Sequence, residues 1–200
     1  MKKWLFLILL FPLTCVAQTY RYLGVEDGLS NRRVYCIQKD KTGYMWFLTH
    51  EGIDRYNGKE FKRYKLMDGD AEVNSLLNLN WLYIDQEGVL WEIGKKGKVF
   101  RYDQIHDCFS LVYKLPMESF SEQPDPVTYA WLDQNKHIWL CNKDTIFLYN
   151  TDTKQVTHIK NDISEEITDI EQIDESHFFI GTETVSYTHL RAHETAANLV

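Results

Sequence analysis

The sequence predicts an all-β protein, a partial β-propeller of about three and a half blades with four antiparallel strands in each. In three stretches an aspartate is followed six residues later by a tryptophan, and a tyrosine follows ten or eleven residues after that. The successive aspartates, the last of which heads a shortened fourth copy, lie 45, 48 and 41 residues apart. A period of about 40–50 residues that is filled with short, aromatic-rich strands is typical of propeller blades.

The first repeat shows how one blade is built. An apolar, β-branched run predicts its first strand, and glycine-containing turns separate the second strand from its neighbours. Asn57-Gly58 is a strong hairpin signal. The strand that follows it alternates apolar and polar residues, as an outer, half-solvated strand does. The four strands are expected at 34–39, 44–49, 53–56 and 59–64.

The repeated residues are interpreted as a scaffold, because a catalytic constellation would not recur three times at blade spacing. We expect the aspartate to accept hydrogen bonds from turn amides, the glycines to permit positive φ, and the tryptophan to be buried between blades. The fourth copy begins at Asp174 and brings Phe179 to the aromatic position. The scaffold residues are Asp40, Gly43, Trp46, Gly52, Tyr56, Asp85, Gly88, Trp91, Gly97, Tyr102, Asp133, Trp139 and Tyr149.

The N-terminal residues 1–17 are expected to be a secretory signal peptide. Two lysines precede an apolar run of ten residues, Trp4 to Leu13, which is too short to span a bilayer. Cleavage is expected after Ala17, which places the mature protein in the periplasm. A lipoprotein signal at Cys15 is the alternative, although Leu13 and Thr14 are not the small residues that such a signal requires.

The C-terminal residues 185–200 are expected to be a non-native tail. Val185 to Thr195 matches, in all eleven positions, the translation of a transposase adapter used in short-read library preparation. The native blades would then occupy residues 18–184, and the tail is expected to pack poorly and to break the blade pattern. His189 and His193 have the spacing of zinc ligands on a helix, but they lie within the adapter match, so no metal is assigned.

Composition and motifs argue against several classes of function. The net charge is −7 and no basic stripe is present, so nucleic-acid binding is not expected. Cys36, Cys108 and Cys141 show no CxxC or zinc spacing, and Cys36 and Cys141, which lie in apolar runs, are interpreted as small buried hydrophobes. Gly94 to Lys98 (GKKGK) lacks the Walker pattern and aligns with a blade turn. Met67 to Ser75 is expected to be a solvated loop, with ligand binding as the alternative. No cofactor is expected.

Trp81 and Trp131 are the candidate ligand-binding residues. They lie four and two residues before their repeat aspartates, so they are not equivalent and do not belong to the shared scaffold. An exposed tryptophan face could stack on a sugar ring, and a propeller face is where a ligand could meet it. Core packing of the inner strands is the alternative.

The first repeat also carries a family resemblance. The stretch YLGVEDGLSNRRVYCIQKDKTGYMWFLTHEGIDRYNGKEFKRY resembles the start of the sensor region of hybrid two-component systems, and its repeat is similar to the two-component regulator propeller repeat. In the third repeat, Lys136 and Thr145 stand where that pattern has glycines. The residues that match the pattern are Asp40, Gly43, Trp46, Thr49, Gly52, Tyr56 and Asn57.

The resemblance implies a much longer parent protein. Such proteins have two periplasmic propellers, an immunoglobulin-like domain, one membrane span, and a cytoplasmic histidine kinase, receiver and helix-turn-helix domain. They sense oligosaccharides, and their paired sensor regions imply self-association. This chain would carry only the first blades, with no catalytic residues of its own. The parent would be anchored in the inner membrane by a span outside this chain.

Two other classes of function remain open from the sequence. Propellers also host lyases and glycosidases, but these need acid and base residues that converge on the central channel, and the repeats supply none. A passive envelope scaffold is the third class. Tyr20 to Leu23 is expected to be an outer strand that would pair with the last blade of a complete ring.

Overall fold

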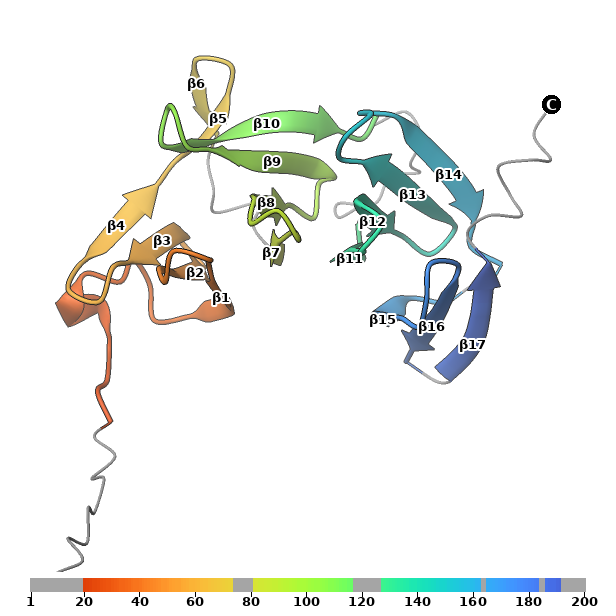
Figure 1. The fold of residues 1–200 in the computed structure, drawn as a ribbon, viewed down its shortest axis with the longest axis horizontal. Coiled ribbons are helices and arrows are strands. Elements are labelled where there is room, and N and C mark those ends of the chain that lie inside the picture. The colour runs from red at the N-terminus through yellow and green to blue at the C-terminus, as the bar shows by residue number, and fades with distance from the viewer. Residues whose placement is uncertain (1–19, 74–80, 117–126, 163–164, 184–185, 192–200) are drawn as a thin grey trace, which may run out of the picture.

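The computed structural model describes residues 20–73, 81–116, 127–162 and 165–183, together with the backbone of 186–191. The signal-peptide prediction and the last part of the tail lie outside these residues. The described chain forms four separate sheets, and its only helix is a short 3-10 turn, η2, at Val25–Asp27. Figure 1 shows the sheets following one another along an arc, with their first strands on the concave side. The predicted all-β partial propeller is confirmed.

The first and third sheets are regular four-stranded blades in which every strand pairs with the next along the chain. The strands of the first sheet lie close to the residue ranges that the sequence predicts. These strands are β1 (Val34–Lys39), β2 (Met45–Thr49), β3 (Gly52–Tyr56) and β4 (Phe61–Tyr64) in the first sheet, and β11 (Tyr129–Leu132), β12 (His137–Cys141), β13 (Thr145–Asn150) and β14 (Val156–Lys160) in the third.

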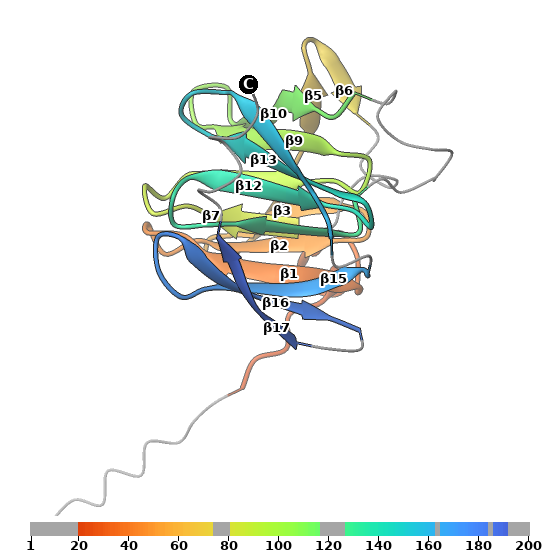
Figure 2. The same ribbon diagram turned by 90° about the vertical axis from the view of Figure 1, so that its right-hand side faces the viewer.

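The second sheet carries an extra hairpin on its outer edge. Its blade strands are β7 (Trp81–Ile84), β8 (Leu90–Ile93), β9 (Lys98–Asp103) and β10 (Cys108–Lys114). The hairpin of β5 (Leu66–Asp68) and β6 (Ala71–Val73) adds parallel to β10 and projects from the sheet in Figure 2. The interpretation of Met67 to Ser75 as a loop was therefore wrong up to Val73. Leu66 is 2% exposed and pairs with Val73, so the apolar ends of the hairpin hold it against the core.

The fourth sheet contains β15 (Ile167–Gln172), β16 (His177–Thr182) and β17 (Ser186–Arg191). The expectation that the tail would break the blade pattern was wrong for β17, because this strand pairs antiparallel with β16. An open strand edge pairs through its backbone groups and accepts most extended sequences, which explains why these residues fit. The origin of the tail is a separate question and stays a prediction.

Three hydrophobic clusters of the described residues lie between neighbouring sheets, and a fourth, around Phe47 and Tyr56, lies on the first sheet alone. In the first three sheets the tryptophan of the second strand faces the following sheet. In the second, third and fourth sheets the residue before this aromatic position faces the preceding sheet. Thus Trp46 packs with Leu90, and Trp91 packs with Ile138. The same alternation places Phe178 against Trp139, with ring centroids 4.8 Å apart.

Phe179 occupies the tryptophan position of the fourth sheet. It pairs with Glu171 as Trp139 pairs with Trp131, yet it is 44% exposed because no described sheet follows it. Residues 20–23 form no strand, unlike the expectation for Tyr20 to Leu23. Within the described residues, no helix has the length and apolar character that crossing a membrane would require.

Candidate functional site

A repeated hydrogen-bond unit fixes each blade turn. In the first repeat, Asp40 Oδ2 accepts from the Trp46 indole Nε1 at 2.8 Å, and Oδ1 accepts from the amides of Thr42 and Tyr44. Burial raises the pKa of Asp40, but the hydrogen bond from the Thr42 hydroxyl, together with those from the indole and the amides, outweighs burial and holds that pKa below its usual value. The bond to the indole is one that the sequence did not predict.

The second and third repeats reproduce this unit. Trp91 Nε1 donates to Asp85 at 2.9 Å, and Trp139 Nε1 donates to Asp133 at 2.9 Å. The turn positions after the aspartates have positive φ in all three repeats. They are Gly43 at 95°, Gly88 at 90° and Lys136 at 66°. Lys136 therefore keeps the glycine-like turn, and its amine pairs with Asp152 at 2.9 Å.

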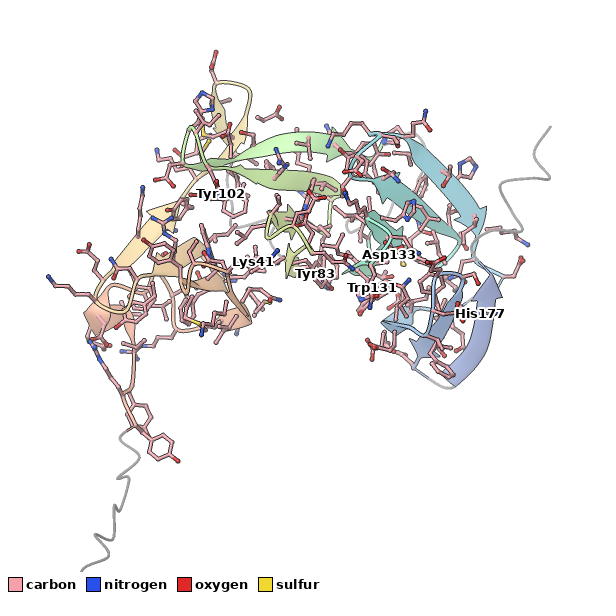
Figure 3. All side chains as sticks on the ribbon, viewed as in Figure 1. Lys41, Tyr83, Tyr102, Trp131, Asp133 and His177 are labelled. Atoms are coloured by element: carbon pink, nitrogen blue, oxygen red, sulfur yellow. The ribbon has the colours of Figure 1, made fainter. Side chains whose placement is uncertain are left out.

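A first cleft of about 350 Å³ lies between the first and second sheets, beside the Asp40 turn. The Arg55 guanidinium stacks over the rings of Tyr44, Trp46 and Tyr64, at 4.5, 5.4 and 5.1 Å. Figure 3 shows Lys41 between these two sheets, and its amine donates to the Gln86 carbonyl. Arg55 also donates to the Tyr102 hydroxyl of the second sheet at 3.4 Å. Lys41 and Arg55 thus join the two sheets, so the cleft is a structural joint.

The far wall of this cleft is held by a second network. Tyr102, labelled in Figure 3, donates its hydroxyl to Asp107 at 2.6 Å, and Lys62 pairs with the same carboxylate. The hydrogen bond from Lys62, followed by that from Tyr102, lowers the pKa of Asp107 to about 2. Asp107 is therefore ionised at neutral pH and serves as an anchor between the sheets.

The first strands of successive sheets are linked by side chains that donate to the next strand. Gln38 donates to the Leu82 carbonyl at 3.1 Å, and Tyr83 donates to the Ala130 carbonyl at 2.7 Å. Gln38 and Tyr83 stand at equivalent positions, each opposite its repeat tryptophan. These bonds set the spacing of the strands along the concave side of the arc, where Figure 3 shows Tyr83.

A second cavity, of about 510 Å³, lies where β1 and β7 meet. Tyr35 is 46% exposed, and its hydroxyl lies 2.9 Å from His50 Nδ1. Trp81 is half-buried and meets the Tyr129 ring edge-on, with centroids 6.4 Å apart. The lining residues are Tyr35, Cys36, Trp81, Leu82, Tyr83 and Lys95.

The two sequence candidates are separated by the structure. Trp81 lines the second cavity, whereas Trp131 packs edge-on against Trp139 and Phe178, with each centroid distance 6.0 Å. Trp131 therefore belongs to the core between the third and fourth sheets. Sequence reasoning missed Tyr35 and Lys95. The available signals were an aromatic residue at an outward position of the first strand and a lysine in a turn that three lysines share.

Other chemistry-bearing residues are buried away from both cavities. Glu92 is fully buried, and neither of its carboxyl oxygens has a partner among the described residues. Burial raises the pKa of Glu92 well above its usual value. Burial likewise raises the pKa of the Cys141 thiol. In the described parts of the chain, no group of three or more histidine, cysteine, aspartate or glutamate residues is placed to hold a metal.

The comparisons with known proteins agree with this architecture. Residues 28–51 match the sequence model of the family described as two component regulator propeller. No curated protein matches the sequence. The structure resembles the extracellular domain of BT3049 from B. thetaiotaomicron, assigned as a hybrid two component system, with 24% identity and a TM-score of 0.64. That likeness covers 85% of this chain and 26% of the other.

Two further structures show the range of the likeness. The extracellular domain of BT4673 from the same bacterium, also assigned as a hybrid two component system, gives 20% identity and a TM-score of 0.59, covering 77% of this chain and 22% of that one. Virginiamycin B lyase from Staphylococcus aureus gives 16% identity and a TM-score of 0.54, covering 74% of this chain and 48% of that one. The chain thus spans about a quarter of the two extracellular domains. The family match and these neighbours confirm the resemblance stated from the sequence.

Proposed function

We propose that this chain forms the first blades of a periplasmic sensing propeller that responds to oligosaccharides. The observation that carries the proposal is the match of residues 28–51 to the two component regulator propeller family, within a structure whose sheets repeat one Asp–Trp unit. Residues 1–17 would direct export. The parent protein would be a sensor histidine kinase anchored in the inner membrane, with its catalytic domains outside this chain.

The lining of the second cavity supports binding rather than turnover, and the first cleft is a structural joint. Glycoside hydrolysis needs two carboxyl groups on opposite sides of a bond, about 5–9.5 Å apart. The described residues that line the second cavity include no carboxylate. The first cleft is lined by two carboxylates, and both are engaged within the protein: Asp40 is held by its own turn and by Trp46, and Glu87 pairs with Lys136. Aromatic rings with a single cation are suited to recognising a ligand without cleaving it.

The mechanism would be a shift between two arrangements of paired sensor regions. A sugar that binds one arrangement more tightly moves the equilibrium toward it by the difference in binding free energy. The side-chain bonds between sheets, such as Tyr83 to the Ala130 carbonyl, make the blades a stiff unit that could transmit such a shift.

An enzyme is the second candidate function, because the chain also resembles virginiamycin B lyase in fold. The two candidates are separated by calorimetry of the extracytoplasmic region of the intact protein with plant, host and microbial oligosaccharides. Chromatography of the same mixtures after incubation reports cleavage. Saturable binding of one sugar class without products supports the sensor. Steady release of cleavage products would instead establish the enzyme.

A further inference from the structure

We propose that the contact between the second and third sheets binds a small-molecule carboxylate, at the place where the contact between the first and second sheets holds the carboxylate of Asp107. We call these two contacts the second joint and the first joint, and Figure 1 shows the three sheets in sequence along the arc. The inference does not depend on the proposed sensing function. It follows from residues that are equivalent in position but differ in charge.

The two joints are built from equivalent residues. In each joint, an arginine of the third strand pairs with the tryptophan of the second strand and lies over its ring. The tryptophan also packs in one cluster with the tyrosine that closes the next repeat. The equivalent residues are Trp46 and Trp91, Arg55 and Arg101, and Tyr102 and Tyr149.

The turn that follows the tyrosine is also the same in both joints. Asp103 in the first joint and Asn150 in the second each accept hydrogen bonds from the amides two and three residues further on. Both turns place a residue with positive φ five positions after the tyrosine. This residue is Asp107 in the first joint, with φ of 51°, and Lys154 in the second, with φ of 63°. A lysine therefore stands where the first joint has an aspartate.

Both joints contain two cations, but only the first contains a carboxylate at this position. In the first joint, Lys62 pairs with Asp107 and stands beside Arg55 across β3 and β4. In the second joint a serine stands at the position of Lys62, and the second cation is Lys154 itself. The second joint thus has the cations of the first joint without their counter-ion.

The two cations of the second joint approach the same indole. Arg101 Cζ lies 6.0 Å and Lys154 Nζ lies 5.7 Å from the Trp91 ring centroid. Neither cation forms an ion pair with a carboxylate of the described residues, and Asp152 in the same turn pairs with Lys136 at 2.9 Å. Burial, followed by the charge of Arg101, lowers the pKa of Lys154, and the opposing effect of Asp152 is smaller. The like charges therefore repel each other, which an anion would relieve.

A buried hydroxyl without a partner lies at the same place. In the first joint, the Tyr102 hydroxyl donates to Asp107 at 2.6 Å. Tyr149 is 0% exposed, and its hydroxyl has no hydrogen-bond partner among the described residues. Leaving a buried polar group without a partner is costly. Because Tyr149 and Lys154 are placed as Tyr102 and Asp107 are, an anion beside Lys154 would accept the hydrogen bond that Tyr149 lacks.

A carboxylate suits these donors. Its two oxygens can accept from the Tyr149 hydroxyl and from the two cations, and the bonds from the cations are charge-assisted. The Lys154 amine donates to the Thr151 carbonyl, which leaves its other N–H groups for a ligand. Arg101 and Lys154 are both exposed, so a ligand can reach them from solvent. The group that the first joint supplies from its own chain would here come from outside.

The test compares acetate with acetamide, which has nearly the same shape but no charge. Thermal unfolding of the protein is followed by tryptophan fluorescence near neutral pH, with the ionic strength held constant by sodium chloride. A ligand that binds only the folded state raises the midpoint temperature as its concentration rises. We expect acetate at ten times its dissociation constant to raise the midpoint by about 3–5 °C, and acetamide to cause no such rise.

Variants locate the effect. Lys154→Asp supplies the carboxylate that the first joint has, so we expect a higher midpoint without ligand and no response to acetate. Tyr149→Phe removes the unpartnered hydroxyl, so it should lose at least half of the acetate response while its midpoint without acetate does not fall. Lys143→Asp is the matched control, because it makes the same charge change at an exposed residue before the other end of β13.

Each outcome decides the inference. An acetate response no larger than that of acetamide would overturn it. An acetate response that persists unchanged in Lys154→Asp or in Tyr149→Phe would place the anion elsewhere and overturn it equally. The same holds for a response that is lost in Lys143→Asp, because the effect would then follow overall charge. None of these results bears on the oligosaccharide ligand of the proposed function, which is tested separately by sugar binding.

Discussion

Replacing the buried carboxyl of Glu92 is expected to stabilise the protein. Glu92 lies on β8, where its ladder partners Leu82 and Phe100 belong to the core between the first and second sheets. At the equivalent position of the third sheet stands Leu140, which is 1% exposed and lies between Ala130 and Phe147. The fold therefore already accepts a leucine at this point of a blade.

The magnitude follows from the burial of the carboxyl. A buried polar group without a hydrogen-bond partner costs about 1–3 kcal/mol, and burying a leucine contributes about 1.5–3 kcal/mol. Part of that second contribution is already made by the glutamate methylenes. We therefore expect Glu92→Leu to raise the free energy of unfolding by about 2–4 kcal/mol in mildly acidic solution.

The pH dependence provides an independent check. Burial raises the pKa of Glu92 in the folded state above the ordinary value of 4.5, so above that pH the unfolded chain releases a proton that the folded chain retains. The folded state then binds more protons, and stability falls as pH rises, by up to about 1.4 kcal/mol per unit. The stability that depends on the protonated Glu92 carboxyl is fully present below pH 4.5. It is lost as the pH rises from 4.5 toward the raised pKa of the folded state.

Urea unfolding of the wild type, Glu92→Leu and Glu92→Gln at several pH values between 4.5 and 8 measures both effects. Glu92→Gln keeps a polar group but cannot ionise, so its advantage over the wild type should appear only as pH rises. The reasoning is refuted if Glu92→Leu is no more stable than the wild type. It is refuted equally if the stability difference between Glu92→Gln and the wild type does not grow with pH.

Three further predictions concern the scaffold and its open ends. Trp139→Ala should lower the free energy of unfolding by about 3–5 kcal/mol, because it leaves a large cavity between two sheets; chemical denaturation showing a loss below about 1 kcal/mol would contradict the repeat interpretation. Ser30→Ala removes the hydrogen bond of 2.5 Å from the Ser30 hydroxyl to buried Asp54 and should lower the free energy of unfolding by about 1.5–3 kcal/mol in the same assay. An unchanged free energy of unfolding would argue against that bond. The chain should self-associate in sedimentation velocity runs, and Phe179→Ser should reduce this more than the control Val112→Ser; a monodisperse wild-type monomer would disprove it.

The repeat could be predicted from the sequence because each blade solves the same packing problem with the same residues. The Asp40 to Trp46 spacing is visible in the chain, and the structure explains it by a bond from the indole to the carboxylate. The turn conformation was harder to predict, because Lys136 adopts a positive φ without being a glycine. Spacing located that turn where residue identity did not.

The missed elements depended on contacts between distant segments. The β5–β6 hairpin follows the last strand of the first blade, but it joins the second sheet through β10. The residues around the hairpin do not indicate that β10 is its partner strand. The pairing of β17 is similar, because an open edge selects its neighbour by backbone geometry rather than by sequence.

The candidate site was partly predictable for a related reason. In the strand registers, the first strands of the four sheets carry different residues at one equivalent position: Cys36, Trp81, Tyr129 and Asp169. The scaffold needs an extended backbone there but not one side chain, so this position differs in every blade. The side chain at such a position can vary without disturbing the Asp–Trp units. That freedom is why Trp81 stood out from the repeat, whereas its partners in the cavity could be found only once β1 and the lysine-rich turn had been placed beside it.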